Sequence, residues 1–106
     1  MALGADFIVS ARGYMFALGC IQAMQCNKDT CPTGITTHNK RLQQGLNVKD
    51  KTQRVANYNK HIIYGLGLIA HSCGVTHARD LNKSHIRIVA GNGLSVALEK
   101  LYENHQ

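Results

Sequence analysis

Residues 7–32 read FIVSARGYMFALGCIQAMQCNKDTCP and predict a strand, a turn, a helix and a cysteine-bearing loop, in that order. The strand is the short apolar run of residues 7–10, which is rich in β-branched side chains. Residues 11–13 interrupt it, and the pattern of residues 14–25 becomes helical. A single buried strand leaves its backbone N–H and C=O groups without ladder partners. We therefore expect this strand to pair with another copy of the chain or with a larger sheet.

Three cysteines follow with the spacing C-x5-C-x4-C, and they are Cys20, Cys26 and Cys31, with Pro32 directly after the third. Six residues of continuous α-helix turn through about 600°, so Cys20 and Cys26 can face one point only if the helix ends between them. Three thiolates fit an iron–sulfur cube that lacks one iron, and a Cys-Pro step also closes ferredoxin-type motifs. The spacing favours such a cluster. Structural zinc, with His38 as a fourth ligand, and unligated thiols are the alternatives. Zinc is less favoured, because structural zinc usually takes two closely spaced pairs of ligands and the sequence does not offer two.

Downstream of the cysteines, the periodicity predicts mostly helix. A short polar helix is expected within residues 37–44, ended by Gly45. Asn47 can cap a long amphipathic helix that runs to Gly74, since apolar residues recur there at helical spacing. Two glycines inside this helix, Gly65 and Gly67, weaken it and predict the close approach of another element.

The last third of the chain predicts shorter elements. Thr76 and Ser84 are candidate caps of two short helical pieces. The sequence Gly91-Asn-Gly93 then separates these pieces from an apolar-striped helix over residues 94–102.

Composition narrows the class of protein. The chain has 106 residues, of which 44% are hydrophobic and 17% charged, as expected of one small globular domain. Its formal net charge is +6, but the basic residues are spread from Arg12 to Lys100, and aromatic side chains are few. This distribution argues against nucleic-acid binding, which favours a basic stripe with stacking aromatics. A positive net charge favours binding of an anionic cofactor or of an acidic electron-transfer partner.

Cysteine use and hydropathy predict a cytoplasmic protein. No apolar run approaches the roughly 18 residues of a membrane span, and the first residues lack the pattern of a signal peptide. Four cysteines in a reducing compartment are expected to be metal ligands or buried thiols rather than disulfides. Cys73 lies on the apolar stripe of the long helix and is interpreted as a buried thiol.

Five segments together resemble the end of the FMN-binding synthase domain of glutamate synthases. They are LGAD at residues 3–6, SARGYMFALGCIQ at 10–22, CNKDTCPTGITTH at 26–38, RVANY at 54–58 and NKSHI at 82–86. The resemblance covers nearly the whole chain and weakens after about Val89. It implies a (β/α)8 barrel that carries FMN, with a 3Fe-4S cluster held by Cys20, Cys26 and Cys31.

The resemblance also implies an activity and its partners. Electrons from ferredoxin or a nicotinamide-dependent reductase subunit would pass through the cluster to FMN, which reduces 2-iminoglutarate, formed from 2-oxoglutarate and ammonia, to L-glutamate. Residues 7–10 would be the eighth barrel strand. Such barrels commonly bind phosphate after their last strands, so Ser10, Ala11, Arg12 and Gly13 are expected at the FMN phosphate.

A whole barrel needs about 250 residues, so we expect the C-terminal fragment of one, incomplete and inactive alone. The expected fold is mostly α with one or two short strands, the last β/α unit plus a helical extension. The remainder of the barrel or another copy of the chain would complete it. The expected parts of this single partial domain are residues 1–25 (last strand and helix), 26–45 (cysteine loop and short helix), 46–74 (long helix) and 75–106 (short helices and terminal helix). The alternative function is a non-enzymatic helical module with zinc-bound or free thiols and a basic partner-binding surface.

Overall fold

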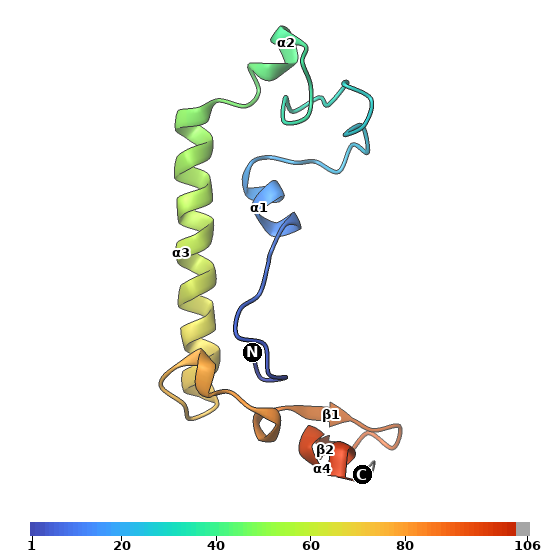
Figure 1. Ribbon diagram of the computed structural model, residues 1–106, viewed down its shortest axis with the longest axis vertical. Coiled ribbons are helices and arrows are strands. Elements are labelled where there is room, and N and C mark those ends of the chain that lie inside the picture. The colour runs from blue at the N-terminus through green and yellow to red at the C-terminus, as the bar shows by residue number, and fades with distance from the viewer. Residues whose placement is uncertain (104–106) are drawn as a thin grey trace. The chain divides into compact units, whose positions relative to one another are not determined.

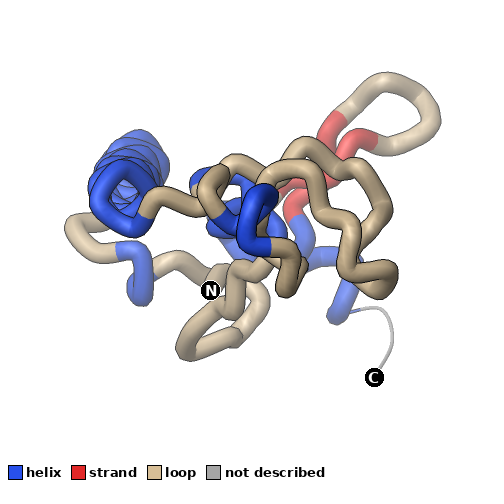
Figure 2. Tube along the Cα trace, turned by 90° about the horizontal axis from the view of Figure 1, so that it is seen from above, coloured by secondary structure: helices blue, strands red, loops and turns tan. Residues whose placement is uncertain are grey.

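The computed structural model describes residues 1–103, which are mostly helical with one two-stranded sheet. In chain order the elements are α1 (Arg12–Ala17), α2 (Lys40–Gln43), α3 (Val48–Ser72), the 3-10 helices η1 (Ala78–Asp80) and η2 (Lys83–His85), the strands β1 (Arg87–Val89) and β2 (Ser95–Ala97), and α4 (Leu98–Glu103) (Figure 1). Figure 2 shows how much of the remaining chain is loop. This secondary structure agrees with the predicted fold class, which is mostly α with one or two short strands. The last of the predicted parts, residues 75–106, extends past the described residues.

The long helix predicted within residues 46–74 is α3, and both of its ends have local causes. The Asn47 side-chain oxygen accepts a hydrogen bond from the Asp50 backbone N–H at 3.1 Å, which satisfies one free donor of the first turn. At the other end, Gly74 adopts a φ of +79°, and its N–H donates to the His71 carbonyl at 2.9 Å. A left-handed glycine after the last turn is a common helix stop.

The chain forms two compact units, and the cysteine loop belongs to the unit Val9–Ile62. In this unit α1 packs against α3 through Tyr14 and Tyr58, whose ring centroids lie 5.2 Å apart in an edge-to-face arrangement. The Tyr14 hydroxyl also donates to the Asn59 side-chain oxygen at 2.6 Å. A Cβ at Gly13 would overlap the Tyr58 hydroxyl, so this contact requires glycine. These residues fix the helix that precedes the cysteines.

Helix α1 is shorter than the sequence predicts, because it ends at Ala17 rather than near Gln25. The N–H of Gly19 donates to the Phe16 carbonyl at 2.9 Å, and its φ of +103° is open to glycine but not to other residues. The chain therefore leaves the helix before Cys20, so the predicted helix end between Cys20 and Cys26 comes earlier than expected.

Residues 7–10 do not form the predicted strand. Phe7 and Val9 are 79% and 83% exposed, and no strand of the described residues pairs with this segment. The β-branched pattern alone cannot make a strand, because a strand needs a neighbour for its backbone hydrogen bonds.

The second unit, Met1–Ile8 with Ile63–Gln106, holds the sheet. Strands β1 and β2 are antiparallel, with Arg87 opposite Ala97 and Val89 opposite Ser95. The Arg87 guanidinium donates to the Ser95 hydroxyl at 2.8 Å and to the Ser95 carbonyl at 2.9 Å. The predicted helix over residues 94–102 is therefore wrong in its first turn: residues 95–97 are a strand, and helix α4 begins at Leu98.

The two short helical pieces are η1 and η2, but their caps differ from the prediction. The His77 imidazole accepts from the Arg79 N–H at 3.1 Å, and the Asn82 side chain accepts from the Ser84 N–H at 3.0 Å. The Asn82 N–H in turn donates to His85 Nδ1 at 3.1 Å, which completes a reciprocal cap. Thr76 and Ser84 are not the caps, because the neighbouring imidazole and amide supply the acceptors.

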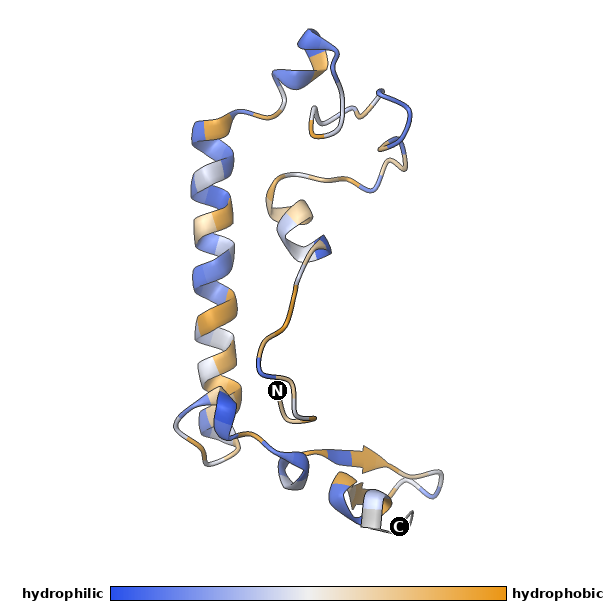
Figure 3. Cartoon of the chain, in the orientation of Figure 1, coloured by the Kyte–Doolittle hydropathy of each residue, from blue (hydrophilic) through white to orange (hydrophobic). Residues whose placement is uncertain are grey.

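The described residues do not close a hydrophobic core. The buried apolar residues are only Ala70, Ala78 and Leu98 within residues 1–103, and the expectation of one small globular core is wrong there. Figure 3 shows apolar residues concentrated in the second half of α3, and a Cβ added at Gly65 or Gly67 would meet no atom within 4 Å. The close approach expected at these glycines is therefore not made by any described residue. The arrangement is consistent with a fragment of a larger domain.

Within residues 1–103, no helix is both long enough and apolar enough to cross a membrane.

Candidate functional site

The three cysteines of the C-x5-C-x4-C motif line one cavity of about 380 Å³, which we call the cysteine cavity. The other lining residues come from α1, from the loop between the first two cysteines, and from the segment after the third. They are Arg12, Met15, Phe16, Ile21, Gln22, Ala23, Met24, Gln25 and Thr33. Met15 and Phe16 give the α1 side of this cavity an apolar wall. Residues far apart along the loop thus converge on one space of the size that ligand sites have.

Left-handed residues shape the loop that brings the cysteines together. Gln22, Met24 and Asp29 have φ values of 56°, 55° and 59°, a conformation that is uncommon outside glycine. Two of them lie between Cys20 and Cys26, and the third lies between Cys26 and Cys31. A left-handed residue interrupts regular helix or strand, so residues 22–29 form an irregular loop after helix α1.

Cys31 is the cysteine whose sulfur receives the most stabilisation from its surroundings. Its Sγ lies 3.3 Å from the Thr33 hydroxyl oxygen. This hydroxyl, followed by the backbone N–H of Thr36, lowers the pKa of the Cys31 thiol from 9.0 to about 6. A thiol with this pKa is largely thiolate at neutral pH, and the thiolate is the form that binds metal.

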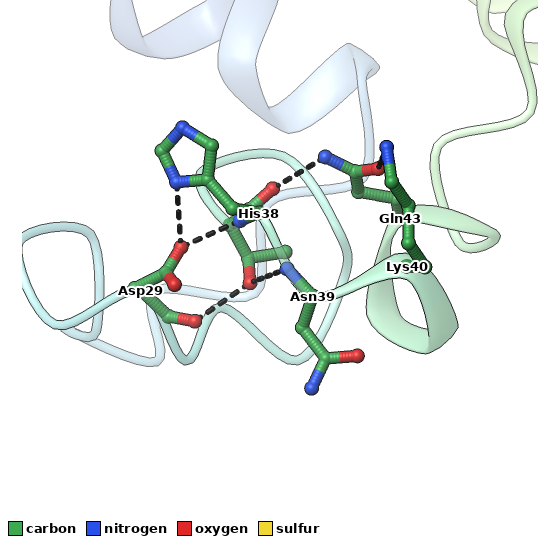
Figure 4. A network of polar contacts seen from close by, with 6 residues as sticks. Asp29, His38, Asn39, Lys40 and Gln43 are labelled. Atoms are coloured by element: carbon green, nitrogen blue, oxygen red, sulfur yellow. Dashed lines mark hydrogen bonds and ion pairs between the residues drawn. The ribbon is translucent and has the colours of Figure 1, made fainter.

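A hydrogen-bond network closes the loop that contains Cys31 (Figure 4). The Asp29 carboxylate accepts from the His38 backbone N–H at 2.5 Å and lies 3.0 Å from His38 Nδ1. The buried Thr37 hydroxyl donates to the Asp29 carbonyl at 2.6 Å and accepts from the Asn39 N–H at 3.1 Å. Gln43 of α2 donates to the Thr37 carbonyl at 2.9 Å. The network therefore ties both ends of residues 29–38 to helix α2.

The bonds from His38 also favour the ionised form of Asp29. Its pKa is lowered from 3.8, first by the backbone hydrogen bond from His38 and then by the side-chain one. The His38 side chain is 96% exposed and does not line the cysteine cavity. His38 is thus part of the loop closure, and the zinc alternative that used it as a fourth ligand is not supported by its position.

Three thiols that line one cavity are donors of the kind that iron–sulfur clusters use. Within residues 1–103, no three His, Cys, Asp or Glu side chains gather as the ligands of one metal ion would. A cluster, however, spreads its thiolates over several iron atoms, so they lie further apart than the ligands of one zinc ion. Three thiols around a shared cavity, one of them stabilised as thiolate, suit this arrangement. Cys73 belongs to the other unit and is half-buried.

The four residues predicted at the FMN phosphate lie at the start of α1. Ser10, Ala11 and Arg12 are exposed, and Gly13 is half-buried. No side chain caps α1, so the first backbone N–H groups of this helix lack the acceptor that a capping residue provides. Free N–H donors with an adjacent hydroxyl and guanidinium fit a phosphate group. Arg12 also lines the cysteine cavity, so this segment and the cysteines meet at one residue.

Sequence reasoning missed three residues that hold this site together, namely Thr33, Thr37 and Tyr58. Thr33 follows Cys31 by two positions, and Thr37 belongs to a polar cluster before a short helix. Both patterns are common in loops, so neither indicates a functional residue by itself. Tyr58 contacts Gly13 across 45 residues of sequence, a separation over which periodicity carries no information.

Comparisons with known proteins agree with the sequence motifs. Residues 1–76 match the family model described as a conserved region in glutamate synthase. Over 101 residues the chain is 38% identical to the glutamate synthase large subunit-like protein YerD of Bacillus subtilis (strain 168). That alignment covers 95% of this chain and 19% of the relative, so the chain spans about a fifth of the length of the protein it matches. No solved structure gives a significant match.

Proposed function

This chain belongs to the glutamate synthase family, and from that premise we propose that it is the cluster-holding part of a larger FMN-dependent oxidoreductase domain. The observation that carries the proposal is the convergence of Cys20, Cys26 and Cys31 on one cavity. The motif spacing, the cavity and the family are three separate reasons to assign these thiols to one cofactor.

In this proposal the three thiols are the ligands of a 3Fe-4S cluster. When bound, the cluster supplies one-electron transfer and FMN supplies hydride transfer. The chain's own contribution is to present Cys31 as a thiolate, through the Thr33 hydroxyl and the backbone N–H groups that follow. The network around Asp29 and Thr37 holds the loop in the conformation that keeps the sulfurs on the cavity.

We assign the FMN phosphate to Ser10, Ala11, Arg12 and Gly13. The uncapped N–H groups at the start of α1 would donate to phosphate oxygens, with the Ser10 hydroxyl and the Arg12 guanidinium beside them. Because Arg12 also lines the cysteine cavity, its charge would lie between the phosphate and the sulfur ligands. Both cofactors carry negative charge, which the net charge of +6 favours.

The remainder of the domain is proposed to be a (β/α)8 barrel. Residues 7–10 would be its eighth strand and residues 1–25 its last β/α unit, with the later residues as a helical extension. Two observations support this reading: the exposed apolar run at residues 7–9, and the exposed apolar end of α3. Surfaces of this kind are normally covered in a folded protein. The relative's greater length leaves ample sequence to cover them.

The whole protein is proposed to form L-glutamate from 2-oxoglutarate and ammonia. Its electrons would come from ferredoxin or a nicotinamide-dependent reductase subunit. This chain would lie on the electron path through the cysteine cavity. No group in it is assigned to recognise 2-oxoglutarate, so substrate binding is assigned to the remainder of the barrel.

The test is an anaerobic purification of the chain followed by measurement of iron, sulfide, zinc and flavin, with low-temperature paramagnetic resonance. We expect about three irons per chain and a 3Fe-type signal. Cys26→Ser should abolish both, because it removes one of three ligands. Cys73→Ser is the matched control and should keep the iron, since Cys73 lies in the other unit. Zinc in place of iron, or unchanged iron in Cys26→Ser, would overturn the proposal.

A further inference from the structure

Thr33 lines the cysteine cavity, and in the proposed function its hydroxyl helps to keep Cys31 ionised. It lies in the step Cys31-Pro32-Thr33, and its hydroxyl oxygen is 3.3 Å from the Cys31 sulfur. When Cys31 is ionised or bound to iron, its sulfur has no proton to donate, so the Thr33 O–H must be the donor. The hydrogen bond thus points from a lining side chain onto a ligand sulfur.

The backbone around Thr33 holds this hydroxyl in place. The Gly34 N–H donates to the Cys31 carbonyl at 3.2 Å, which closes a tight turn with Thr33 inside it. Gly34 has a φ of +80°, and a Cβ there would overlap the Leu42 carbonyl at the end of α2. A Cβ at Gly45 would come 2.8 Å from the Thr33 carbonyl oxygen. The Thr33 backbone is therefore held between the cysteine loop and the end of α2, and its side chain is half-buried.

The contact distinguishes Cys31 from the other two motif cysteines. Within residues 1–103, side-chain hydrogen bonds reach Cys31 but not Cys20 or Cys26. The hydroxyl of Thr30, which directly precedes Cys31 in the sequence, donates to the Gln25 side-chain oxygen at 3.0 Å and not to a sulfur. One ligand of the three is thus polarised by a fixed hydroxyl.

We propose that Thr33 is a positioning residue that raises the reduction potential of the cluster through its hydrogen bond to the Cys31 sulfur. The inference rests on the proposed function. Adding an electron makes the ligand sulfurs more negative, and a hydrogen-bond donor stabilises the more negative state. Removing the donor should therefore make the cluster harder to reduce.

The experiment compares Thr33→Val, Thr33→Ser and Thr30→Val in the whole chain, purified without oxygen. Valine keeps the shape of threonine but loses the hydroxyl, serine keeps the hydroxyl, and Thr30→Val removes a neighbouring hydroxyl that does not touch sulfur. The measurement is a redox titration followed by the 3Fe paramagnetic signal, with iron and sulfide content in parallel. We expect a more negative midpoint for Thr33→Val, with several-fold less reduced cluster at a fixed potential. Thr33→Ser and Thr30→Val should match the original chain.

The outcomes separate this inference from the proposed function. Absence of iron from the unsubstituted chain would overturn both. Normal iron content with the same midpoint in Thr33→Val would overturn the role of Thr33 alone. If Thr33→Val loses its iron, the iron content of Thr33→Ala is measured as well, and circular dichroism tests whether the variants keep their helix content. Iron loss in both variants with unchanged helix content, and iron retained in Thr33→Ser, would show that the hydroxyl is needed to bind the cluster and would overturn its assignment to the reduction potential. Iron loss in Thr33→Ser as well would contradict any role of the hydroxyl.

Discussion

The Asp29 carboxylate accepts a hydrogen bond from the His38 backbone N–H at 2.5 Å, while His38 Nδ1 lies 3.0 Å from the same oxygen. This residue pair is one part of the network that closes the loop that carries Cys31. Neither side chain lines the cysteine cavity, yet the conformation of the segment between them depends on the contact. Under the proposed function, loop closure and cofactor binding would therefore be linked through residues that do not touch the cofactor.

Asp29→Ala should open this loop. Alanine removes the acceptor, so we expect faster hydrogen exchange of the His38 backbone amide and less iron per chain. Asn can still accept from the N–H, so Asp29→Asn should have a smaller effect. Asp80→Ala, in the other unit, is the control. The measurements are amide exchange by nuclear magnetic resonance and iron analysis; equal exchange rates in Asp29→Ala and the original chain would contradict the linkage.

The same contact should weaken in acid. The hydrogen bonds from His38 lower the pKa of Asp29 below 3.8, so the carboxylate stabilises the closed loop at any pH above 3.8. This stabilisation is lost as the pH falls through the lowered pKa of the folded chain. His38 amide protection should therefore hold to below pH 3.8 and then fall, and in Asp29→Asn this step should be missing.

Cys31 should react as a thiolate in the metal-free chain. Its pKa is lowered from 9.0 to about 6, first by the Thr33 hydroxyl. Alkylation of Cys31 by iodoacetamide, followed by mass spectrometry, should reach half its maximal rate near pH 6 and level off above it. In the unfolded chain the midpoint should return toward 9.0. Since the folded pKa is the lower one, ionisation stabilises the folded loop above pH 9.0, and this contribution is lost as the pH falls toward 6.

The control for this prediction is Thr33→Val, which should move the midpoint upward because the largest cause of the shift is removed. A Cys31 midpoint that stays near 9.0 in the folded chain would show that the loop does not stabilise the thiolate.

The sequence predicts what depends on local pattern. Helix α3 follows from apolar periodicity between Asn47 and Gly74, and the convergence of the cysteines follows from their spacing and the loop-forming residues between them. The hairpin at residues 87–97 could not be predicted, because three-residue strands show no period and the pair is fixed by the bonds from Arg87 to Ser95. At residues 7–10 the error is the reverse, because a strand is predicted and none forms. The apolar, β-branched pattern is present, but among the described residues the segment has no neighbouring strand to receive its backbone hydrogen bonds.

Gly13→Ala should destabilise the docking of α1 on α3. The added Cβ would overlap the Tyr58 hydroxyl, and overpacking of this kind costs about 1–3 kcal/mol. Tyr58→Phe removes the overlapping oxygen, so the double variant should recover part of the loss. Four chains, the original, each single variant and the double, are compared by chemical denaturation with circular dichroism. If the changes in the free energy of unfolding of the two single variants add up to that of the double variant, the two residues do not touch.

The exposed end of α3 should make the isolated chain bind apolar dyes and associate with itself. Ile63 and Leu68 are 60% and 51% exposed, and this stretch of the helix is apolar on nearly every side. A helix of that character is normally buried. Replacing both residues by lysine should lower binding of anilinonaphthalene sulfonate and shift the chain toward monomer in analytical ultracentrifugation. Asn57→Lys, a charge added at an exposed polar position of α3, should change neither.

The same two lysines should have the opposite effect once the surface is covered. If the remainder of a larger domain packs on this end of α3, the substitutions place unpaired charges in a buried interface, which is strongly unfavourable. Joined to the rest of such a protein, the doubly substituted chain should therefore fold less stably than the original, while Asn57→Lys should be neutral. A pair of lysines that improves solubility alone and is also harmless in the complete protein would mean that this end of α3 stays exposed there.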